Sequence, residues 1–370
     1  MRLGILFLLL LLSFGISVET HAQNTKPGDK DDVIRVDTQL VDVPIAVQSA
    51  NGTPVRNLKS SDFVVYEDGK RQEIVDFSTT SAPFEVALLL DTSGSTRSDL
   101  QLIQRAAQYF ITSLRPGDRV SIIAFNTDRT ENQSLAVSEV LCPLTDNRNA
   151  LNAAIENMKT SFGTPYYDSL LQVVERVFRD PPKEEFRGRR ALVALTDGVD
   201  STSLADFAEA KENIEKAGVI SFFIKVDTRE FFEESLLGDC QSATRFSVTQ
   251  IRRYYKSFNS KANLEKAVTF CQLGDFERLA ISKKLYELAD GEMADLAKNS
   301  GGRVFPVGDL TDARSAFKSV ADEIGTKYTL GYYPSNDKRD GTYRKIKVEL
   351  KGMPAGTKIR AREGYTAPEN

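Results

Sequence analysis

Histidine is almost absent from this 370-residue sequence, in which His21 is the only one. His21 lies in an N-terminal segment that we expect to be removed, so the mature chain has no imidazole. This excludes Ser-His-Asp and Cys-His mechanisms of catalysis and zinc or copper sites with histidine ligands. The sequence also lacks a basic block, and its formal net charge is −4. Both properties argue against nucleic acid or an anionic membrane surface as a partner.

Cysteine is scarce as well, with only Cys142, Cys240 and Cys271 in the chain. An oxidising compartment permits one disulfide among them and leaves one thiol. The spacing does not determine the pairing, although a bond between Cys240 and Cys271 would close a single inserted segment. Cys142 lies in a short apolar run, which favours a buried inert thiol over a catalytic one.

Residues 1–22 have the pattern of a secretory signal peptide. A positive charge at Arg2 precedes an apolar run, and Ala22 ends a small-residue cleavage site before Gln23. The alternative, a membrane anchor, needs roughly 20 apolar residues, and this run is interrupted before that length. No cysteine follows the run to accept a lipid, and no later stretch is long and apolar enough to span a membrane. We therefore expect a secreted or periplasmic protein.

The mature chain of about 350 residues exceeds what one hydrophobic core usually organises, which predicts two or three domains. Residues 23–32 are polar and form a flexible leader. Alternating apolar residues and turn signals predict β-strands in an N-terminal segment, 33–79, and in a C-terminal segment, 327–370. Either segment alone has too few strands to be stable, so we expect both to pair into one small β-sandwich-like domain.

Residues 80–326 alternate between strand and helix patterns, which predicts a doubly wound, mostly parallel α/β sheet inserted between the two β segments. Its first strand is the apolar run 84–90, and its last helix is Ala316–Ile324. From about 228 to 284 no strand signal occurs, and this stretch predicts a helical insertion. The insertion is either a decoration packed on the domain edge or a lid or docking surface for a partner.

Three predicted loops carry oxygen-bearing side chains at the carboxyl ends of the strands, where an open parallel sheet binds its ligands. Asp91, Ser93 and Ser95 follow the first strand at a spacing of two residues, Thr164 precedes a helix, and Asp197 follows a later strand. Carboxylate and hydroxyl oxygens select Mg2+, Mn2+ or Ca2+ over zinc and copper. Because these side chains are few, water or a foreign ligand must complete the coordination.

An Asp-x-Ser-x-Ser sequence by itself is more often a turn or a helix cap, because Asp and Ser favour both. Its position after a buried strand, together with Gly163–Pro165 before a helix and Thr196–Gly198 after a strand, argues against coincidence. The combination resembles a von Willebrand factor type A domain with a metal-ion-dependent adhesion site. The terminal segments, through residues 62–69 and 362–365, resemble bacterial secreted proteins related to that family.

The resemblance implies a role for each of the five loop residues. Ser93 and Ser95 would bind the cation directly, and Asp91, Thr164 and Asp197 would bind it directly or through water. A carboxylate from a partner protein or a surface polymer would take the open position. In relatives that switch, the last helix of the domain moves and changes these loops.

We expect an exported, divalent-cation-dependent binding or adhesion module, in which Mg2+, or else Mn2+ or Ca2+, bridges to an acidic group of the partner. One alternative is a structural component of a cell-envelope assembly, in which the ion only rigidifies the loops. Another is a metal-assisted hydrolase, which needs a general base. The candidate bases have simpler explanations. Asp200 is more simply a helix cap, and Asp168 is more simply a residue that supports the metal ligands.

Overall fold

The computed structural model describes residues 40–79, 82–93, 100–129, 134–240, 245–258 and 270–369. The predicted signal peptide, 1–22, and the predicted leader, 23–32, lie outside these described residues. Within the described ranges, no helix combines the length and the apolar character needed to cross a membrane. The described residues all belong to one compact unit, 38–370, and they form three β-sheets.

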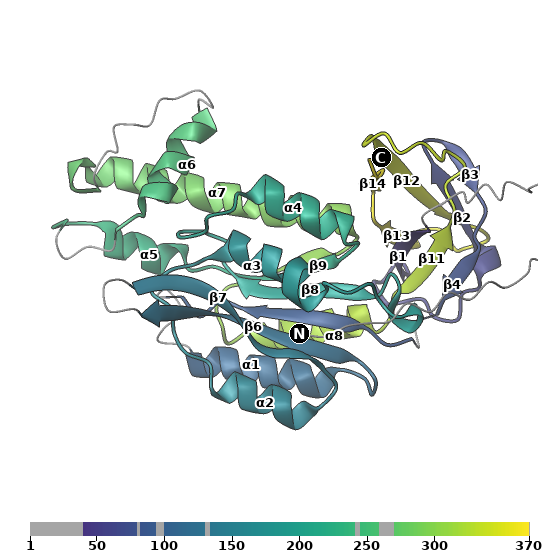
Figure 1. The fold of residues 1–370 in the computed structure, drawn as a ribbon, viewed down its shortest axis with the longest axis horizontal. Coiled ribbons are helices and arrows are strands. Elements are labelled where there is room, and N and C mark those ends of the chain that lie inside the picture. Colours follow the sequence, from purple (N-terminus) through teal and green to yellow (C-terminus); the bar gives the residue numbers. More distant parts are fainter. Residues whose placement is uncertain are drawn as a thin grey trace, which may run out of the picture. The chain divides into compact units, whose positions relative to one another are not determined.

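The largest sheet has six strands (Figure 1). Their order is β10 (Arg303–Val307), β9 (Ile220–Val226), β8 (Arg190–Thr196), β5 (Glu85–Leu90), β6 (Arg119–Arg129) and β7 (Ser134–Thr145). Neighbouring strands are parallel from β10 to β6, and only the edge strand β7 is antiparallel to its neighbour. The central strands β5 and β8 are buried along their whole length, because helices cover both faces of the sheet.

Helices lie on both faces of this sheet (Figure 1). One face carries α1 (Leu100–Ser113), α2 (Arg148–Glu156) and α8 (Ala313–Ile324), and the other carries α3 (Tyr166–Gln172), α4 (Phe207–Lys216) and α7 (Asp275–Ser300). Successive side chains of β5 point to opposite faces, so Leu88 and Leu90 pack with the first set of helices and Ala87 and Leu89 with the second. The predicted doubly wound, mostly parallel α/β fold is confirmed.

The two terminal segments pair with each other in both of the smaller sheets. One sheet has the order β13 (Lys358–Ala361), β1 (Val41–Gln48), β11 (Tyr328–Tyr332) and β4 (Asp76–Ser78), and the other β14 (Gly364–Thr366), β12 (Tyr343–Leu350), β2 (Phe63–Glu67) and β3 (Lys70–Gln72). Ile45 of β1, Phe63 of β2 and Tyr328 of β11 share one hydrophobic core. The prediction of a β-sandwich-like domain built from both ends of the chain is therefore confirmed.

Strand β7 has no counterpart among the predicted elements. It lies at the edge of the large sheet, and only Ser138 and Cys142 are buried along it. Its sequence therefore lacks the continuous apolar run of an interior strand. Cys142 is a free cysteine, and burial raises the pKa of its thiol, as expected for an inert side chain.

The predicted helical insertion contains α5 (Arg229–Leu236), α6 (Val248–Phe258) and the first half of α7. These helices share a core of their own, which includes Leu236 and Ile251. A disulfide joins Cys240 to Cys271, whose Cα atoms lie 5.2 Å apart, so the pair expected to close the insertion is bonded.

Helix α7 runs past the expected end of the insertion near residue 284. Ile281 and Leu285 in its first half pack in the core of the insertion, whereas Met293 and Leu296 in its second half pack against the large sheet. One continuous helix therefore belongs to the insertion and to the α/β domain. The hydrophobic pattern of α7 does not reveal where the insertion ends, because buried residues recur at helical spacing along the whole helix. What changes along α7 is the core into which these residues pack.

Candidate metal centre

Two of the predicted metal residues lie where neighbouring parallel strands end. Strand β5 leads into Asp91, and its neighbour β8 leads into Asp197. Leu90 pairs with Leu195 in the sheet, and the backbone N–H of Asp91 donates to the carbonyl of Leu195 (2.9 Å). Both aspartates are thus held at the carboxyl edge of the sheet, the edge at which open α/β sheets bind ligands.

The carboxylate of Asp91 is buried and held from two sides. Its Oδ1 accepts the backbone N–H of Ser93 (3.0 Å), and its Oδ2 accepts the hydroxyl of Thr196 (2.7 Å). The Thr196 hydroxyl in turn accepts the N–H of Gly198 (2.9 Å), so Asp91 connects the loop after β5 to the loop after β8. Ser93 is buried in the same loop as Asp91, whereas the predicted ligand Ser95 lies outside the described residues.

Asp197 is also buried, and a hydroxyl from the insertion orients it. Its Oδ1 accepts the N–H of Val199 (2.9 Å), and its Oδ2 accepts the hydroxyl of Thr228 (2.5 Å). The hydroxyl of Tyr286, on α7, lies 2.8 Å from that of Thr228. Because Thr228 has one hydroxyl proton and gives it to Asp197, Tyr286 is the donor in this second bond. A chain of hydrogen bonds therefore runs from α7 to a predicted metal ligand.

The loop of Thr164 is tied to the other two by its backbone. The N–H of Thr164 donates to the hydroxyl of Ser201 (2.8 Å), and its carbonyl accepts the N–H of Ser201 (3.0 Å). The N–H of Ser161 donates to the carbonyl of Thr92 (2.8 Å). The structure therefore brings together the loops that carry Asp91, Thr164 and Asp197, which are distant in the sequence.

Burial raises the pKa of both carboxyl groups. The pKa of Asp91 lies above its ordinary value because the group is desolvated, although hydrogen bonds from Ser93 and Thr196 act in the opposite direction. Burial, followed by the negative charge of Asp91, raises the pKa of Asp197 to about 7, and the nearby charge of Asp227 acts in the same direction. A cation between the loops would relieve this repulsion between like charges.

The donors present fit a hard divalent cation. Asp91, Asp197, Ser93 and Thr164 offer only oxygen, the ligand type that Mg2+, Mn2+ and Ca2+ prefer. Among the residues that the structure describes, no three His, Cys, Asp or Glu side chains gather into a metal-binding group. A cation held here would therefore rely on hydroxyls, water and a foreign ligand in addition to the two carboxylates.

Tyr166, at the start of α3, is a further sign of an incomplete site. Its side chain is fully buried, and its hydroxyl has no hydrogen-bond partner among the described residues. Burial chiefly, together with the negative charges of Glu292, Asp200 and Asp91, raises the pKa of Tyr166. A buried hydroxyl without a partner costs roughly 1–3 kcal/mol, and such groups are expected where water or an ion completes a site.

The two candidate bases of a hydrolase are both engaged by backbone N–H groups. Oδ2 of Asp200 accepts the N–H groups of the first two residues of α3, at 2.9 and 3.3 Å, and burial raises the pKa of Asp200 to about 6. The carboxylate of Asp168 accepts the N–H groups of Leu204 and Ala205. Asp200 thus holds the start of α3 from a segment distant in the sequence, while Asp206 is the N-cap of the helix that follows Asp200. Asp168 holds the loop around Leu204.

Three residues that the sequence does not single out support the predicted ligands. Thr196 donates to Asp91, Thr228 donates to Asp197, and Tyr286 donates to Thr228. Thr196 directly precedes Asp197, and this position next to a predicted ligand is a pattern from which its role could be predicted. Thr228 lies 31 residues after Asp197, at the start of the insertion, and no local pattern connects either Thr228 or Tyr286 to the metal motif. Only the tertiary fold brings the hydroxyl of Thr228 to the carboxylate of Asp197 and the hydroxyl of Tyr286 to that of Thr228.

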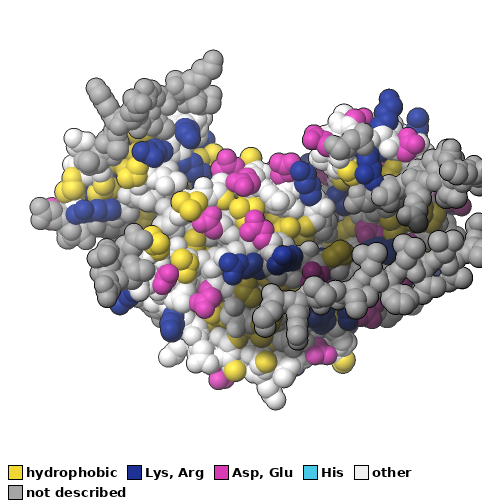
Figure 2. Space-filling view, in the orientation of Figure 1, with side chains coloured by type: hydrophobic (Ala, Val, Ile, Leu, Met, Phe, Trp, Pro, Cys, Tyr) yellow, Lys and Arg dark blue, Asp and Glu magenta, His cyan; other side chains and the backbone are white. Residues whose placement is uncertain are grey.

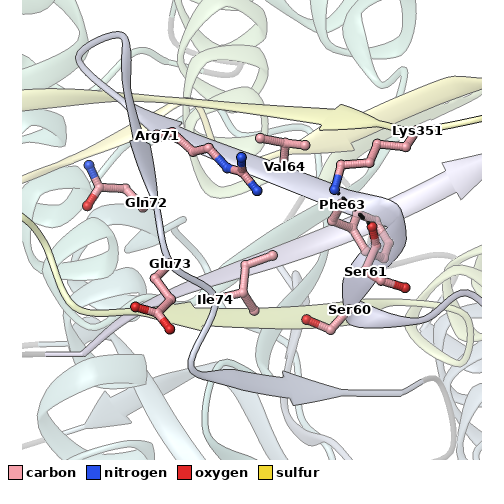
Figure 3. Close-up of a pocket in the computed structure, with 9 residues that line it drawn as sticks. All are labelled: Ser60, Ser61, Phe63, Val64, Arg71, Gln72, Glu73, Ile74 and Lys351. Carbon is pink, nitrogen blue, oxygen red and sulfur yellow. Dashed lines mark hydrogen bonds between the residues drawn. The ribbon is translucent and has the colours of Figure 1, made fainter.

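Two surface cavities of about 420 Å³ each are lined by other residues. The first lies in the β domain and is lined partly by Arg71, Lys351 and Glu73 (Figure 3). The second lies beside α5, where acidic residues line it together with Arg229, which is ion-paired with Glu233 at 2.8 Å. Because both cavities combine charges of opposite sign, neither favours one class of ligand. None of the four predicted metal residues that the structure describes, Asp91, Ser93, Thr164 and Asp197, lines either of them.

Comparison with known proteins finds one family model that matches, in the central part of the chain. The family model described as von Willebrand factor type A domain matches residues 86–199. No curated protein matches the chain. Among solved structures, the conserved hypothetical protein BatB from Bacteroides thetaiotaomicron is 17% identical, and the match covers 65% of this chain and 98% of that one, with a TM-score of 0.40.

Two other solved structures have the same TM-score of 0.40. One is a von Willebrand factor type A protein from Catenulispora acidiphila, which is 12% identical over 90% of this chain and 75% of that one. The other is proximal thread matrix protein 1 from the mussel byssus, with a zinc-occupied metal-ion-dependent adhesion motif, which is 13% identical over 65% of this chain. This chain spans only 48% of the mussel protein.

Proposed function

We propose that this protein is a divalent-cation-dependent binding module that recognises an acidic group of a partner. The match of residues 86–199 to the model of von Willebrand factor type A domains supports this proposal. One observation carries the proposal. Asp91 and Asp197 are buried at the ends of adjacent strands, and hydroxyl and N–H donors orient both carboxylates. Two like charges are held at a sheet edge where ligands bind, next to hydroxyl residues that suit the same cation.

In this proposal Asp91, Ser93, Ser95, Thr164 and Asp197 hold the cation. A bound divalent cation supplies positive charge and an open coordination position for a carboxylate. The chain itself supplies rigidity, because the hydrogen bonds among the three loops fix the donors before the partner arrives. Donors that are already in place lose little conformational entropy on binding, which favours affinity.

We further propose that the protein acts outside the cytoplasm. Residues 1–22 have the composition of a signal peptide. The disulfide between Cys240 and Cys271 supports the same location, because structural disulfides persist in oxidising compartments. The partner would then be another exported protein or a surface polymer that offers a carboxylate.

The other two kinds of function predict different behaviour. A hydrolase needs a general base, and the carboxylates of Asp168 and Asp200 are occupied by backbone N–H groups. A purely structural role predicts that removal of the cation lowers stability while the partner still binds a Thr164→Ala variant. A binding module predicts that this variant loses the partner.

Calorimetric titration of Mg2+ and Mn2+ into chelator-stripped protein tests the proposal. We expect saturable heat from the wild-type protein and none from Asp91→Ala, because the variant lacks one of two carboxylates. An Asp337→Ala variant, which removes an exposed carboxylate in the β domain, is the control and should bind like the wild type. If folded wild-type protein binds neither ion, the proposal is wrong.

A further inference from the structure

Exposed apolar side chains recur on the helices of the insertion. Leu237, directly after α5, is 42% exposed, and Val248 and Phe258 of α6 are 50% and 68% exposed. Figure 2 shows Lys and Arg side chains beside hydrophobic ones over α6, at the upper left of the view. Single exposed apolar side chains are normal, whereas a surface that combines several of them can bind a partner. The insertion is therefore a candidate interaction surface.

The side of α5 that faces solvent is acidic. Glu230, Glu234 and Leu237 follow one another at spacings of four and three residues, which places them on the same side of a helix. All three are exposed, and they line the same surface cavity. Arg229 lines that cavity as well, but its charge is compensated by the ion pair with Glu233. We refer to Glu230, Glu234 and Leu237 as the acidic stripe.

The side of α6 that faces solvent has the opposite charge. Val248, Arg252 and Lys256 recur every four residues, so they also lie on one side of their helix. All three are exposed, whereas Gln250 and Ile251 on the other side are buried. The sequence of α6 contains no Asp or Glu. We refer to Val248, Arg252 and Lys256 as the basic stripe.

The charges of both stripes are directed to solvent and not to each other. Nearby ion pairs use other side chains, since Arg229 pairs with Glu233 (2.8 Å) and Arg253 with Glu292 (2.6 Å). Leu236 of α5 and Ile251 of α6 pack in the core of the insertion, so the two stripes point away from the core that their helices share. Within a single chain the stripes therefore stay uncovered.

The two stripes match each other when their helices run antiparallel. In each stripe the charged residues are four positions apart, which is about 6 Å along a helix axis. The apolar residue follows the charges in the acidic stripe and precedes them in the basic one. Antiparallel alignment therefore brings two pairs of opposite charge and one apolar pair into register: Glu230 with Lys256, Glu234 with Arg252, and Leu237 with Val248.

We propose that two copies of the chain associate through their insertions, with α5 of each copy packed antiparallel against α6 of the other. A two-fold axis makes the two contacts equivalent, which closes the assembly as a dimer. Charge complementarity selects this occupant, because a second copy carries both stripes and opposite charges fix the partner and the direction of paired helices. The inference goes beyond the proposed function, since none of the six stripe residues is a predicted cation ligand.

Sedimentation equilibrium of the mature protein, in chelator and with the disulfide intact, tests this inference. We expect the mass to rise from one chain toward two over the micromolar to millimolar range, where small interfaces dissociate. High salt should weaken the association, because it screens exposed charges. A Glu230→Lys/Glu234→Lys variant and an Arg252→Glu/Lys256→Glu variant place like charges opposite each other. Each should raise the dissociation constant at least about tenfold.

A mixture of the two charge-reversed variants provides the decisive measurement. One variant has two basic stripes and the other has two acidic ones, so a dimer with one copy of each restores both contacts. We expect the mixture to associate like the wild type. The matched control is Glu184→Lys/Glu185→Lys, which changes the net charge by the same amount at exposed positions before β8. The insertion follows the opposite end of the parallel neighbour β9, so this control should associate like the wild type.

Three results would overturn the inference. The first is a wild-type protein that stays a single chain over the whole concentration range. The second is association of both charge-reversed variants with the affinity of the wild type, which would place the interface elsewhere. The third is a mixture of the two variants, each folded by circular dichroism, that remains monomeric. Because these measurements are made in chelator, they are independent of the Mg2+ and Mn2+ titrations that test the proposed function.

Discussion

At the scale of single residues, Asp197 is held in place and is also difficult to ionise. The hydroxyl of Thr228 and the N–H of Val199 orient its carboxylate. Burial and the charge of Asp91 raise its pKa to about 7. Binding of a cation and loss of the proton from Asp197 are therefore coupled, because the deprotonated carboxylate is the ligand.

This coupling predicts how stability depends on pH when no cation is present. The carboxyl of Asp197 titrates at about 7 in the folded protein and near its ordinary value of 3.8 in the unfolded chain. Between these values the folded state binds more protons than the unfolded state, so the free energy of unfolding falls as the pH rises. We expect thermal unfolding in chelator to show a fall on the order of a few kcal/mol between about pH 4 and pH 7.

An Asp197→Asn variant isolates the contribution of this residue. Burial also raises the pKa values of Asp42 and Asp200 to about 6, so they add to the fall in the wild type and in the variant alike. The variant should show a shallower dependence, whereas Asp337→Asn, at an exposed position, should behave like the wild type. Equal dependence in wild type and Asp197→Asn would contradict the expected titration.

At the scale of secondary-structure elements, the insertion supports the predicted metal site. Thr228 at its start donates to Asp197, and Val199, in the loop after Asp197, packs in the hydrophobic core of the insertion. Arg253 of α6 forms an ion pair with Glu292 of α7 (2.6 Å). The insertion is therefore more than a decoration on the domain edge, because its packing reaches the loop of a predicted ligand.

The disulfide of the insertion should contribute to the stability of this support. Cys240 and Cys271 are 31 residues apart, and closing a loop of that length is worth about 3–4 kcal/mol when the restriction of the unfolded chain is counted. We expect a reductant to lower the unfolding temperature of the wild type measured by calorimetry. Mg2+ affinity should fall as well, because Asp197 is oriented by residues attached to the insertion.

A Cys240→Ser/Cys271→Ser variant provides the matched control. It retains the buried thiol of Cys142, so any effect of the reductant on that residue is present in both proteins. We expect the variant to unfold at the temperature of the reduced wild type and to show no response to reductant. A reductant that shifts both proteins equally would mean that the disulfide does not stabilise the fold.

At the scale of the whole molecule, the proposed export can be tested directly. Small side chains at the end of residues 1–22 favour cleavage after Ala22. We expect mass spectrometry of the protein recovered outside the cytoplasm to give a chain that begins at Gln23. Ala22→Arg, which places a large charged side chain at the cleavage position, should retain the segment. Wild-type protein found only in the membrane fraction with Met1 present would instead support a membrane anchor.

The sequence by itself determined the class of the fold and the chemistry of the candidate site. Apolar runs such as that of β5 identify strands buried on both faces, because a central parallel strand has no solvent-exposed side. Asp91 and Asp197 directly follow such strands, so their place at the carboxyl edge follows from the alternation of strands and helices. The pairing of the two terminal segments could also be predicted, because neither segment has enough strands to form a stable domain by itself.

Only the tertiary structure decided which residues support that site. The hydroxyl of Thr228 reaches Asp197, and that of Tyr286 reaches Thr228, only in the folded chain. A contact between segments that are distant in the sequence leaves no trace in local periodicity. The close packing at Gly163, where an added Cβ atom would lie 2.7 Å from Cγ2 of Thr202, is likewise set by how distant segments meet. A hydrophobic pattern shows which side of a helix or strand is buried. Which other helix or strand covers that side is determined by the packing of the whole chain.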